Sequence, residues 1–437
     1  MSTVAHSSAD SRRAVATRVA AALRTEAGLA RFALGVVSLH VVDDNFLQPN
    51  AGTSAGDHLV SGLVPLGLLV LAGIAYPRLR AGARATIALL AGFFGVLAGT
   101  EAVHYTRAVG ASGDDYTGLL SIPAGLLLIG LGAVTLWKSR RTDDRLWWRY
   151  LRRLLLVAGS LVAVVAALLP FAIAYIVTHA ARATVPTADL GAPYENVEFT
   201  TADGLRLKGW YIRSRNGAAV ISFPGRASSQ KRAKLLARHG YGVLVFDRRG
   251  EGQSEGDPNT FGWEGDRDVR AAVAFLQRRP DVNPARIGGI GLSVGGEVMI
   301  EAAAESSELK AIVSEGASSR SVRDEIANGS GWQELIGNSV ATASTALFTN
   351  NLPPRPLKSL VPEISGSVFF VYGEHGQPAE RPANRAFYEA ARGHKAIWEV
   401  PGSGHIGGTE AQPAEYERRV TGFFDRWLAA KPEEGSS

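Results

Sequence analysis

Apolar residues follow two different patterns along the chain of 437 residues. The N-terminal part contains long apolar stretches without a charged residue, of which LVSGLVPLGLLVLAGIA at 59–75 is an example. A membrane-spanning helix needs about 20 mainly apolar residues. Residues 1–182 are therefore predicted to form a helical membrane domain of about five spans, which lie around 32–42, 59–75, 85–100, 116–137 and 154–178. The first of these stretches is the shortest and contains His40.

The basic residues between these stretches predict the orientation of the spans. Arginines and lysines cluster before the first stretch, between the second and third, and between the fourth and fifth. By contrast, 46–58 contains no Lys or Arg and 106–116 contains only Arg107. Because cytoplasmic loops carry the basic excess, a cytoplasmic N-terminus is predicted, and five spans then place the chain after His179 outside the cytoplasm. A cleaved signal peptide is the alternative explanation of the first stretch, but no small-residue cleavage pattern follows it.

The pattern changes after a linker at 183–195 that is rich in Pro, Ala and Gly. Short apolar runs then alternate with amphipathic segments, and strands are predicted at 197–200, 205–212, 218–223, 241–247, 286–292, 310–315, 368–373 and 396–400. Such an alternation is typical of parallel βαβ units. A mostly parallel sheet with helices on both faces is therefore expected over 196–430, with a small cap at about 317–360.

Composition narrows the possible functions. Apolar residues make up 46% and charged residues 20% of the chain, which excludes a disordered protein and is unusually apolar for a soluble enzyme. The absence of cysteine excludes disulfides, thiolate metal sites and a cysteine nucleophile. The net charge of the chain is +5, and the basic clusters of its N-terminal part alternate with apolar spans. This pattern predicts association with a membrane bilayer and not with nucleic acid. No Walker loop or dinucleotide fingerprint is present, and no cofactor is expected.

A serine motif supplies the first candidate chemistry. Gly291-Leu292-Ser293-Val294-Gly295 lies between a predicted strand and a predicted helix, the context that a nucleophile elbow requires. The glycines leave room for a tight, strained turn, and the helix N-terminus favours developing negative charge. His405 lies in a glycine-rich loop after the last predicted strand, from which a base can reach the serine. Ser293 and His405 are therefore the predicted nucleophile and base.

These residues resemble the motifs of the α/β-hydrolase family over about residues 195–430. The segment DRRGEGQS at 247–254 is similar to the family's turn after strand 4, and FPGR at 223–226 occupies the loop that supplies the oxyanion hole. Serine-aminopeptidase-like and dienelactone-hydrolase-like members look most similar. The resemblance implies that the backbone N–H groups of Arg226 and Val294 hold the oxyanion.

The acid of the triad departs from the family pattern. The family usually places Asp three residues after the glycine that ends strand 7, and Gly376 occupies that position here. Glu315, at the end of the strand predicted at 310–315, is the favoured acid, because some family members carry it after strand 6. Glu374 is the second choice. Glu380, further along the chain, or no acid at all complete the alternatives.

The sequence thus predicts a membrane-anchored serine hydrolase that cleaves an ester, thioester or amide through an acyl-enzyme on Ser293. Its substrate is expected to be a small-molecule or lipid-like acyl compound. One alternative is a sensor or binding protein whose hydrolase fold is catalytically impaired. Two positions favour it: Gly376, where the family usually has Asp, and Pro224, where it usually has His. Another is an acyltransferase, because an alcohol or amine can also resolve an acyl-enzyme.

Ionisable residues gather at the predicted outer ends of the first four spans. They are His40, Asp43, Asp44, Asp57, His58, Glu101, His104, Asp114 and Asp115. His40, Asp43 and Asp44 share one helix side through their i, i+3 and i+4 spacing. Three hypotheses follow: solvated helix ends, an interhelical hydrogen-bond network or lipid head-group site, and a zinc or manganese site.

Overall fold

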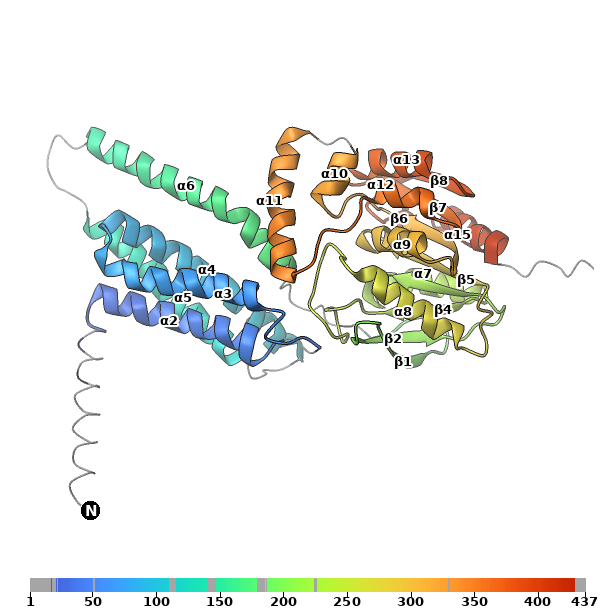
Figure 1. Cartoon of the computed structure of the whole chain (residues 1–437), viewed down its shortest axis with the longest axis horizontal. Helices are drawn as coiled ribbons and strands as arrows, with labels where there is room; N and C mark the ends of the chain where they lie inside the picture. The colour runs from blue at the N-terminus through green and yellow to red at the C-terminus, as the bar shows by residue number, and fades with distance from the viewer. Residues whose placement is uncertain are drawn as a thin grey trace, which may run out of the picture. The chain divides into compact units, whose positions relative to one another are not determined.

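The chain divides into two compact units in a computed structural model (Figure 1). The structure describes residues 17, 21, 23–49, 52–109, 115–139, 147–178, 185, 187–223, 226–328 and 331–428. The first unit comprises Met1–Pro49 and Ser54–Leu169, and the second comprises Asn50–Thr53 and Pro170–Ser437.

Helices make up the first unit. They are α2 (Glu26–Val42), η1 (Asp43–Leu47, a π-helix), α3 (Leu59–Ala75), η2 (Tyr76–Arg78), α4 (Ala81–Val109), α5 (Asp115–Lys138) and most of α6 (Trp147–Thr178). Among the described residues, three helices are long and apolar enough to cross a membrane, at Leu59–Arg78, Ala81–Thr100 and Tyr116–Lys138. The helices α2 and α6 occupy the places of the other two predicted spans, which stay predictions.

Glycines allow α4 and α5 to pack backbone against backbone. A Cβ atom on Gly92 would lie 2.6 Å from the carbonyl oxygen of Gly125, and one on Gly125 would lie 2.5 Å from that of Gly92. The Ser121 hydroxyl donates to the Gly95 carbonyl at 2.8 Å across the same interface. Small residues and interhelical hydroxyl bonds of this kind are typical of packed membrane helices, where lipid supplies no hydrophobic driving force between helices.

Part of the ionisable group at the helix ends forms a hydrogen-bond network. Thr117 on α5 donates to Asp43 at 2.7 Å, and its hydroxyl lies 3.3 Å from Nδ1 of His40 on α2. Asp57 instead accepts bonds from the N–H and hydroxyl of Ser54 in its own loop. Within the described part of the chain, no group of three or more His, Asp or Glu is arranged to hold a metal ion. Outside the described residues lie Asp114 and the side chains of Glu101, His104 and Asp115.

One eight-stranded sheet forms the centre of the second unit, in the order β1-β2-β4-β3-β5-β6-β7-β8. Its strands are β1 (Glu195–Thr200), β2 (Arg206–Ile212), β3 (Ala219–Phe223), β4 (Gly242–Phe246), β5 (Ile287–Leu292), β6 (Leu309–Glu315), β7 (Ser367–His375) and β8 (Lys395–Gly404). The β1–β2 and β2–β4 pairs are antiparallel and all the others are parallel. The expected mostly parallel sheet of an α/β-hydrolase fold is therefore confirmed.

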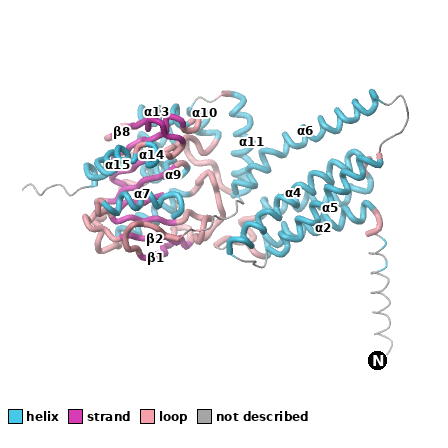
Figure 2. The backbone as a smooth tube through the Cα atoms, turned by 180° about the vertical axis from the view of Figure 1, so that it is seen from behind, coloured by secondary structure: helices cyan, strands magenta, loops and turns pink. Residues whose placement is uncertain are grey.

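Helices cover both faces of this sheet, as Figures 1 and 2 show. They are α7 (Arg226–Arg238), α8 (Gly265–Gln277), α9 (Val294–Glu305), α13 (Glu380–Ala390), α14 (Gly408–Ala411) and α15 (Pro413–Leu428). Successive strand residues point to opposite faces, so Ile221 joins a core with Met299 of α9, and Val220 joins a second core with Phe424 of α15. Burial on both faces explains why the parallel strands read as continuous apolar runs.

Helices fill the chain between β6 and β7, and we call this segment the cap. It consists of α10 (Val322–Asn328), α11 (Trp332–Thr349), α12 (Leu357–Leu360) and η3 (Val361–Glu363). The last turns of α6 belong to this unit and pack on the cap, since the ring of Tyr175 meets that of Phe348 edge-on at a centroid distance of 6.4 Å. The compact units consequently divide inside α6, after Leu169.

Candidate active site

Ser293 occupies a strained turn between β5 and α9. Its backbone angles are φ 54° and ψ −125°, a region that residues other than glycine rarely adopt. A Cβ atom on Gly291 would lie 2.1 Å from the carbonyl oxygen of Gly295, so the turn needs glycine there. The Ser293 N–H donates to the Glu315 carbonyl on the neighbouring strand at 2.7 Å. These constraints hold the serine at the end of β5, as a nucleophile elbow does.

His405 follows β8 and reaches the serine. Its Nε2 atom lies 2.9 Å from Oγ of Ser293, within the range of a hydrogen bond between a base and a nucleophile. The imidazole is 27% exposed, so one side of it faces solvent. The structure thus brings the two predicted residues together, although they are 112 positions apart in the sequence.

Glu380 is the carboxylate that contacts His405. One of its oxygens, Oε1, lies 2.5 Å from Nδ1 of His405 and also accepts the N–H of Gln377 at 2.7 Å. Glu380 is the first residue of α13, and its side chain is only 1% exposed. The hydrogen bond to this carboxylate stabilises the charged imidazolium, and it is the main reason why the pKa of His405 lies above its ordinary value.

Glu315, the favoured acid in the sequence, faces a different partner. Its two carboxylate oxygens both lie 3.1 Å from Nη2 of Arg232, and Tyr416 donates to one of them at 2.6 Å. The same Nη2 donates to the carbonyl of Ile406 at 2.7 Å. The assignment of Glu315 as the partner of His405 is therefore corrected: the buried guanidinium on α7 takes its carboxylate, and the resulting network supports the loop that carries His405.

Glu374, the second choice for the acid, is also placed elsewhere. It is exposed at the end of β7, where it accepts the backbone N–H of Gly402 at 2.8 Å. Sequence reasoning ranked Glu380 low because this residue lies four positions beyond Gly376, where Asp was expected, and begins the next helix. The available signal was a glycine at the usual acid position followed by a Glu at the start of the next helix.

The predicted oxyanion donors lie at two helix N-termini. Val294 is the first residue of α9 and Arg226 is the first residue of α7. The first N–H groups of a helix have no acceptor within the helix and carry partial positive charge. Phe223 pairs with Gly291 in the parallel β3–β5 register, so the chain leaving β3 starts beside the elbow. Pro224 and Gly225 lie outside the described residues, and the role of the two N–H groups stays a prediction.

Glu297, which sequence reasoning did not identify, is buried one turn after Ser293 on α9. It accepts bonds from the N–H and the hydroxyl of Ser318, at 2.9 Å and 3.3 Å. Burial disfavours its charged form and raises its pKa to about 7. This carboxyl group joins α9 to the loop after β6.

The DRRGEGQS segment has a structural role in the described residues. Arg249 donates through Nε to the buried Asp268 at 2.8 Å, and the Ser254 hydroxyl donates to the Asp247 carbonyl at 2.7 Å. A Cβ atom on Gly252 would lie 2.3 Å from Oδ2 of Asp247. The motif therefore fixes the loop that follows β4, at the same end of the parallel strands as Ser293.

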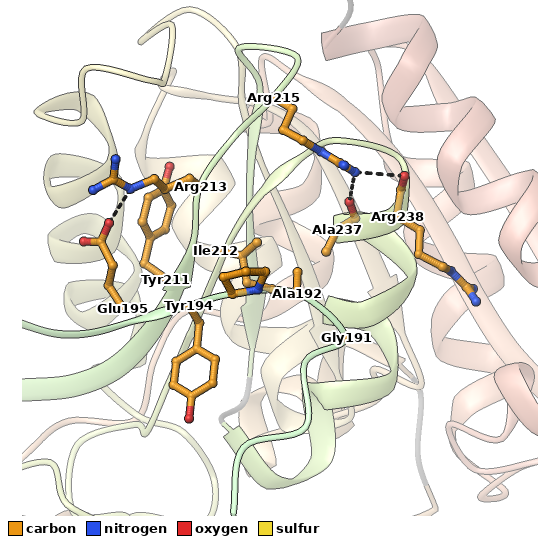
Figure 3. Close-up of a pocket in the computed structure, with 11 residues that line it drawn as sticks. Gly191, Ala192, Tyr194, Glu195, Tyr211, Ile212, Arg213, Arg215, Ala237 and Arg238 are labelled. Atoms are coloured by element: carbon orange, nitrogen blue, oxygen red, sulfur yellow. Dashed lines mark hydrogen bonds and ion pairs between the residues drawn. The ribbon is translucent and has the colours of Figure 1, made fainter.

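An open cavity of about 670 Å³ lies away from this edge (Figure 3). It is lined by Gly191–Glu195, by the end of β2 and by the end of α7. Ile212 of β2 pairs with Val243 at the start of β4. The cavity therefore lies at the amino end of the parallel strands, whereas Ser293 lies at their carboxyl end. Its arginines are already engaged, for instance Arg213 with Glu195 (Figure 3).

Known proteins are similar to parts of this chain. Residues 178–385 match the family model described as X-Pro dipeptidyl-peptidase (S15 family). The uncharacterized protein YfhR of Escherichia coli is 35% identical over 117 residues, which are 24% of this chain and 40% of YfhR. The polyketide transferase grgF of Penicillium sp is 38% identical over 125 residues, 26% of this chain and 41% of that protein. The thiohydrolase aneE of Aspergillus aculeatus is 35% identical over 132 residues, 28% and 41% respectively.

Among solved structures, the esterase PF2001 of Pyrococcus furiosus matches with a TM-score of 0.48 and 24% identity. That match covers 58% of this chain and 99% of the esterase. The chain spans about two fifths of the length of the curated relatives it matches. The family match falls within the second unit, and it supports a hydrolase enzyme.

Proposed function

We propose that this protein is a membrane-anchored serine hydrolase that cleaves an ester, thioester or amide through an acyl-enzyme on Ser293. One observation carries the proposal: His405 lies 2.9 Å from the Ser293 hydroxyl through Nε2 and 2.5 Å from the Glu380 carboxylate through Nδ1. A nucleophile, a base and an orienting acid in this order perform acyl transfer on several unrelated folds.

The proposed reaction begins when Nε2 of His405 takes the proton of the Ser293 hydroxyl as Oγ bonds to the substrate carbonyl carbon. The carbonyl oxygen becomes an oxyanion, for which the N–H groups of Val294 and Arg226 are the proposed donors. Collapse of this intermediate expels the leaving group, which takes the proton from His405. Water then attacks the acyl-serine while Nε2 of His405 takes its proton; the bond between the acyl carbon and Oγ breaks, His405 returns the proton to Ser293, and a carboxylic acid leaves. Glu380 holds the imidazole in position and stabilises its charged form.

Membrane anchoring is supported by three helices, among the described residues, that are long and apolar enough to span a bilayer. The basic residues that alternate between the predicted spans support a cytoplasmic N-terminus. With α2 and α6 as further spans, the hydrolase unit is proposed to lie outside the cytoplasm.

Acyl transfer is the second candidate, and one relative favours it. The 38% identical protein from Penicillium is named a polyketide transferase, while the 35% identical one from Aspergillus is named a thiohydrolase. Both outcomes begin with the same acyl-enzyme and differ in whether water or another nucleophile resolves it. Product analysis of a thioester substrate, with and without an alcohol or amine acceptor, separates the two.

A fluorophosphonate probe tests the proposal on the full-length protein in detergent. We expect the probe to label the protein at Ser293, as located by peptide mass spectrometry, and Ser293→Ala to abolish labelling. Ser339→Ala, at an exposed position of α11, is the matched control and should label like the native chain. A folded native protein that resists the probe would favour the impaired sensor instead.

A further inference from the structure

The cap helix α11 buries several polar side chains and exposes several apolar ones. Its buried side chains include Thr342, Ser344 and Thr345, which are 7%, 2% and 0% exposed. Its exposed side chains include Ile336 and Leu347, at 62% and 49%. A surface helix in a water-soluble domain turns its apolar side to the core and its polar side to solvent. The outer side of α11 is therefore built for an apolar environment.

Apolar residues follow one side of α11. Ile336, Val340, Ala343 and Leu347 are spaced by four, three and four residues; Val340 is half-buried and the other three are exposed. We call these four residues the cap stripe. The sequence carries no charge between Glu334 and Arg355, so no charged side chain interrupts it. Two neighbouring residues add exposed apolar surface, namely Ile326 and Leu352 at 63% and 88%.

The C-terminal end of α11 lies close to the nucleophile. Asn351, just beyond the helix, donates to the carboxylate of Glu264 at 2.9 Å. In the same loop, a Cβ atom on Gly262 would lie 2.7 Å from the side chain of Val294, the residue that follows Ser293. One short loop therefore separates the end of the cap helix from the elbow.

The last turns of α6 identify the apolar environment. This helix carries no charged residue from 154 to 178, and its end packs on α11 through Tyr175 and Phe348. The carbonyl of Val177 also accepts the N–H of Thr260 at 3.0 Å. A helix with the composition of a membrane span thus ends against the cap, and a span reaches water at the bilayer surface.

We propose that the cap stripe rests in the interfacial layer of the lipid bilayer and that Ser293 receives acyl substrates that partition into that layer. An amphipathic helix in this position lies in the membrane plane with its apolar side about 5–10 Å deep in the boundary between head groups and acyl chains. The stripe supplies aliphatic side chains for this contact. The second part of the inference rests on the proposed hydrolase activity and specifies its substrate class as lipid-like esters or thioesters.

The absence of native cysteine makes the first test direct. Ile336→Cys and Leu347→Cys, each in the full-length protein, are labelled with an environment-sensitive fluorophore and reconstituted into phosphatidylcholine–phosphatidylglycerol vesicles. Gly422→Cys on α15 is the control, because a Cβ atom there meets open space. We expect lipids with a nitroxide high on the acyl chain to quench both stripe positions more strongly than the control. Quenching at the control level, in particular with a shielded fluorophore, would mean that protein covers the stripe and would overturn the inference.

The second test separates substrate delivery from chemistry. In the Ile336→Glu, Leu347→Glu double variant, hydrolysis of a long-chain ester embedded in vesicles should fall roughly tenfold or more, because charged side chains leave the interface. Hydrolysis of a short soluble ester and fluorophosphonate labelling in detergent should not change. Asn338→Glu, an exposed position on another side of α11, is the matched control. If the double variant hydrolyses the vesicle ester as fast as the native protein does, or loses both activities equally, the inference is contradicted.

The two proposals fail separately. Quenching at the cap stripe with no labelling of Ser293 would refute the hydrolase activity and leave the membrane contact in place. Labelling of Ser293 with no quenching at Ile336 or Leu347 would refute the membrane contact alone.

Discussion

A Cβ atom on Gly376 would lie 2.4 Å from Oε2 of Glu380, so the side chain of Glu380 fills the space that a residue at 376 would otherwise use. Gly376 holds the position where the resemblance to α/β hydrolases predicts the acid, and Glu380 begins the helix that follows. The absence of a side chain at Gly376 therefore leaves room for the carboxylate of Glu380. The longer side chain of a glutamate on α13 can reach His405 from there.

An exchange of the two residues tests this relationship. Glu380→Ala should lower kcat by roughly 10²–10⁴-fold, because His405 loses its orienting partner. Adding Gly376→Asp to that variant should restore at least roughly tenfold of the loss, since Asp then occupies the vacated space. Gly376→Asp alone should impair the enzyme, because two carboxylates would compete for one site. If the double variant recovers nothing, a carboxylate at 376 cannot take the place of Glu380 and the proposed relationship is wrong.

The pH dependence of kcat/KM provides a second test. His405 must be neutral to take the serine proton, so activity rises with pH through its pKa, which Glu380 holds above the ordinary value. Glu380→Gln removes the negative charge, and the pKa of His405 should fall. The acidic limb of the profile should then move to lower pH while the plateau drops. Glu374→Gln, at an exposed carboxylate bound to Gly402, should leave the midpoint where it is.

The stability of the folded protein should depend on the buried ion pair between Arg232 and Glu315, which supports the loop that carries His405. The side chains of Arg232 and Glu315 are 5% and 2% exposed, and breaking a buried pair of this kind costs about 3–5 kcal/mol. Arg232→Met should therefore lower the unfolding midpoint of the full-length protein in detergent, as followed by tryptophan fluorescence. Arg418→Met, which removes an exposed pair with Glu415, should leave the unfolding midpoint nearly unchanged, because solvent screens that pair. Equal effects of the two variants would exclude a supporting role for Arg232.

Reporter fusions test the predicted orientation. Alkaline phosphatase joined after Ser437 should be active, because the five-span topology places the hydrolase unit outside the cytoplasm. Green fluorescent protein at the same position should be dark. An inactive phosphatase fusion together with a bright fluorescent fusion would place the hydrolase unit in the cytoplasm and contradict the predicted five-span topology.

Local motifs explain which parts of the site the sequence could predict. The turn around Ser293 is specified by glycines within two residues of it, and His405 follows a strand that is recognisable by itself. Glu315 was a reasonable choice by topology, but Arg232, 83 positions away, determines where its carboxylate points. The role of Glu380 depends on the space over Gly376, which only the folded chain defines. Likewise, the sequence of α11 indicates an amphipathic helix, whereas its orientation depends on the elements packed against it.

The backbone conformation of Ser293 that exposes its hydroxyl also lowers the stability of the folded protein. A non-glycine residue at φ 54° and ψ −125° costs of order 1–3 kcal/mol, and the folded protein carries this cost whether or not substrate is bound. A glycine at 293 would relieve the strain and remove the nucleophile at the same time. A variant with glycine at this position should therefore be more stable than the native chain while lacking the proposed nucleophile.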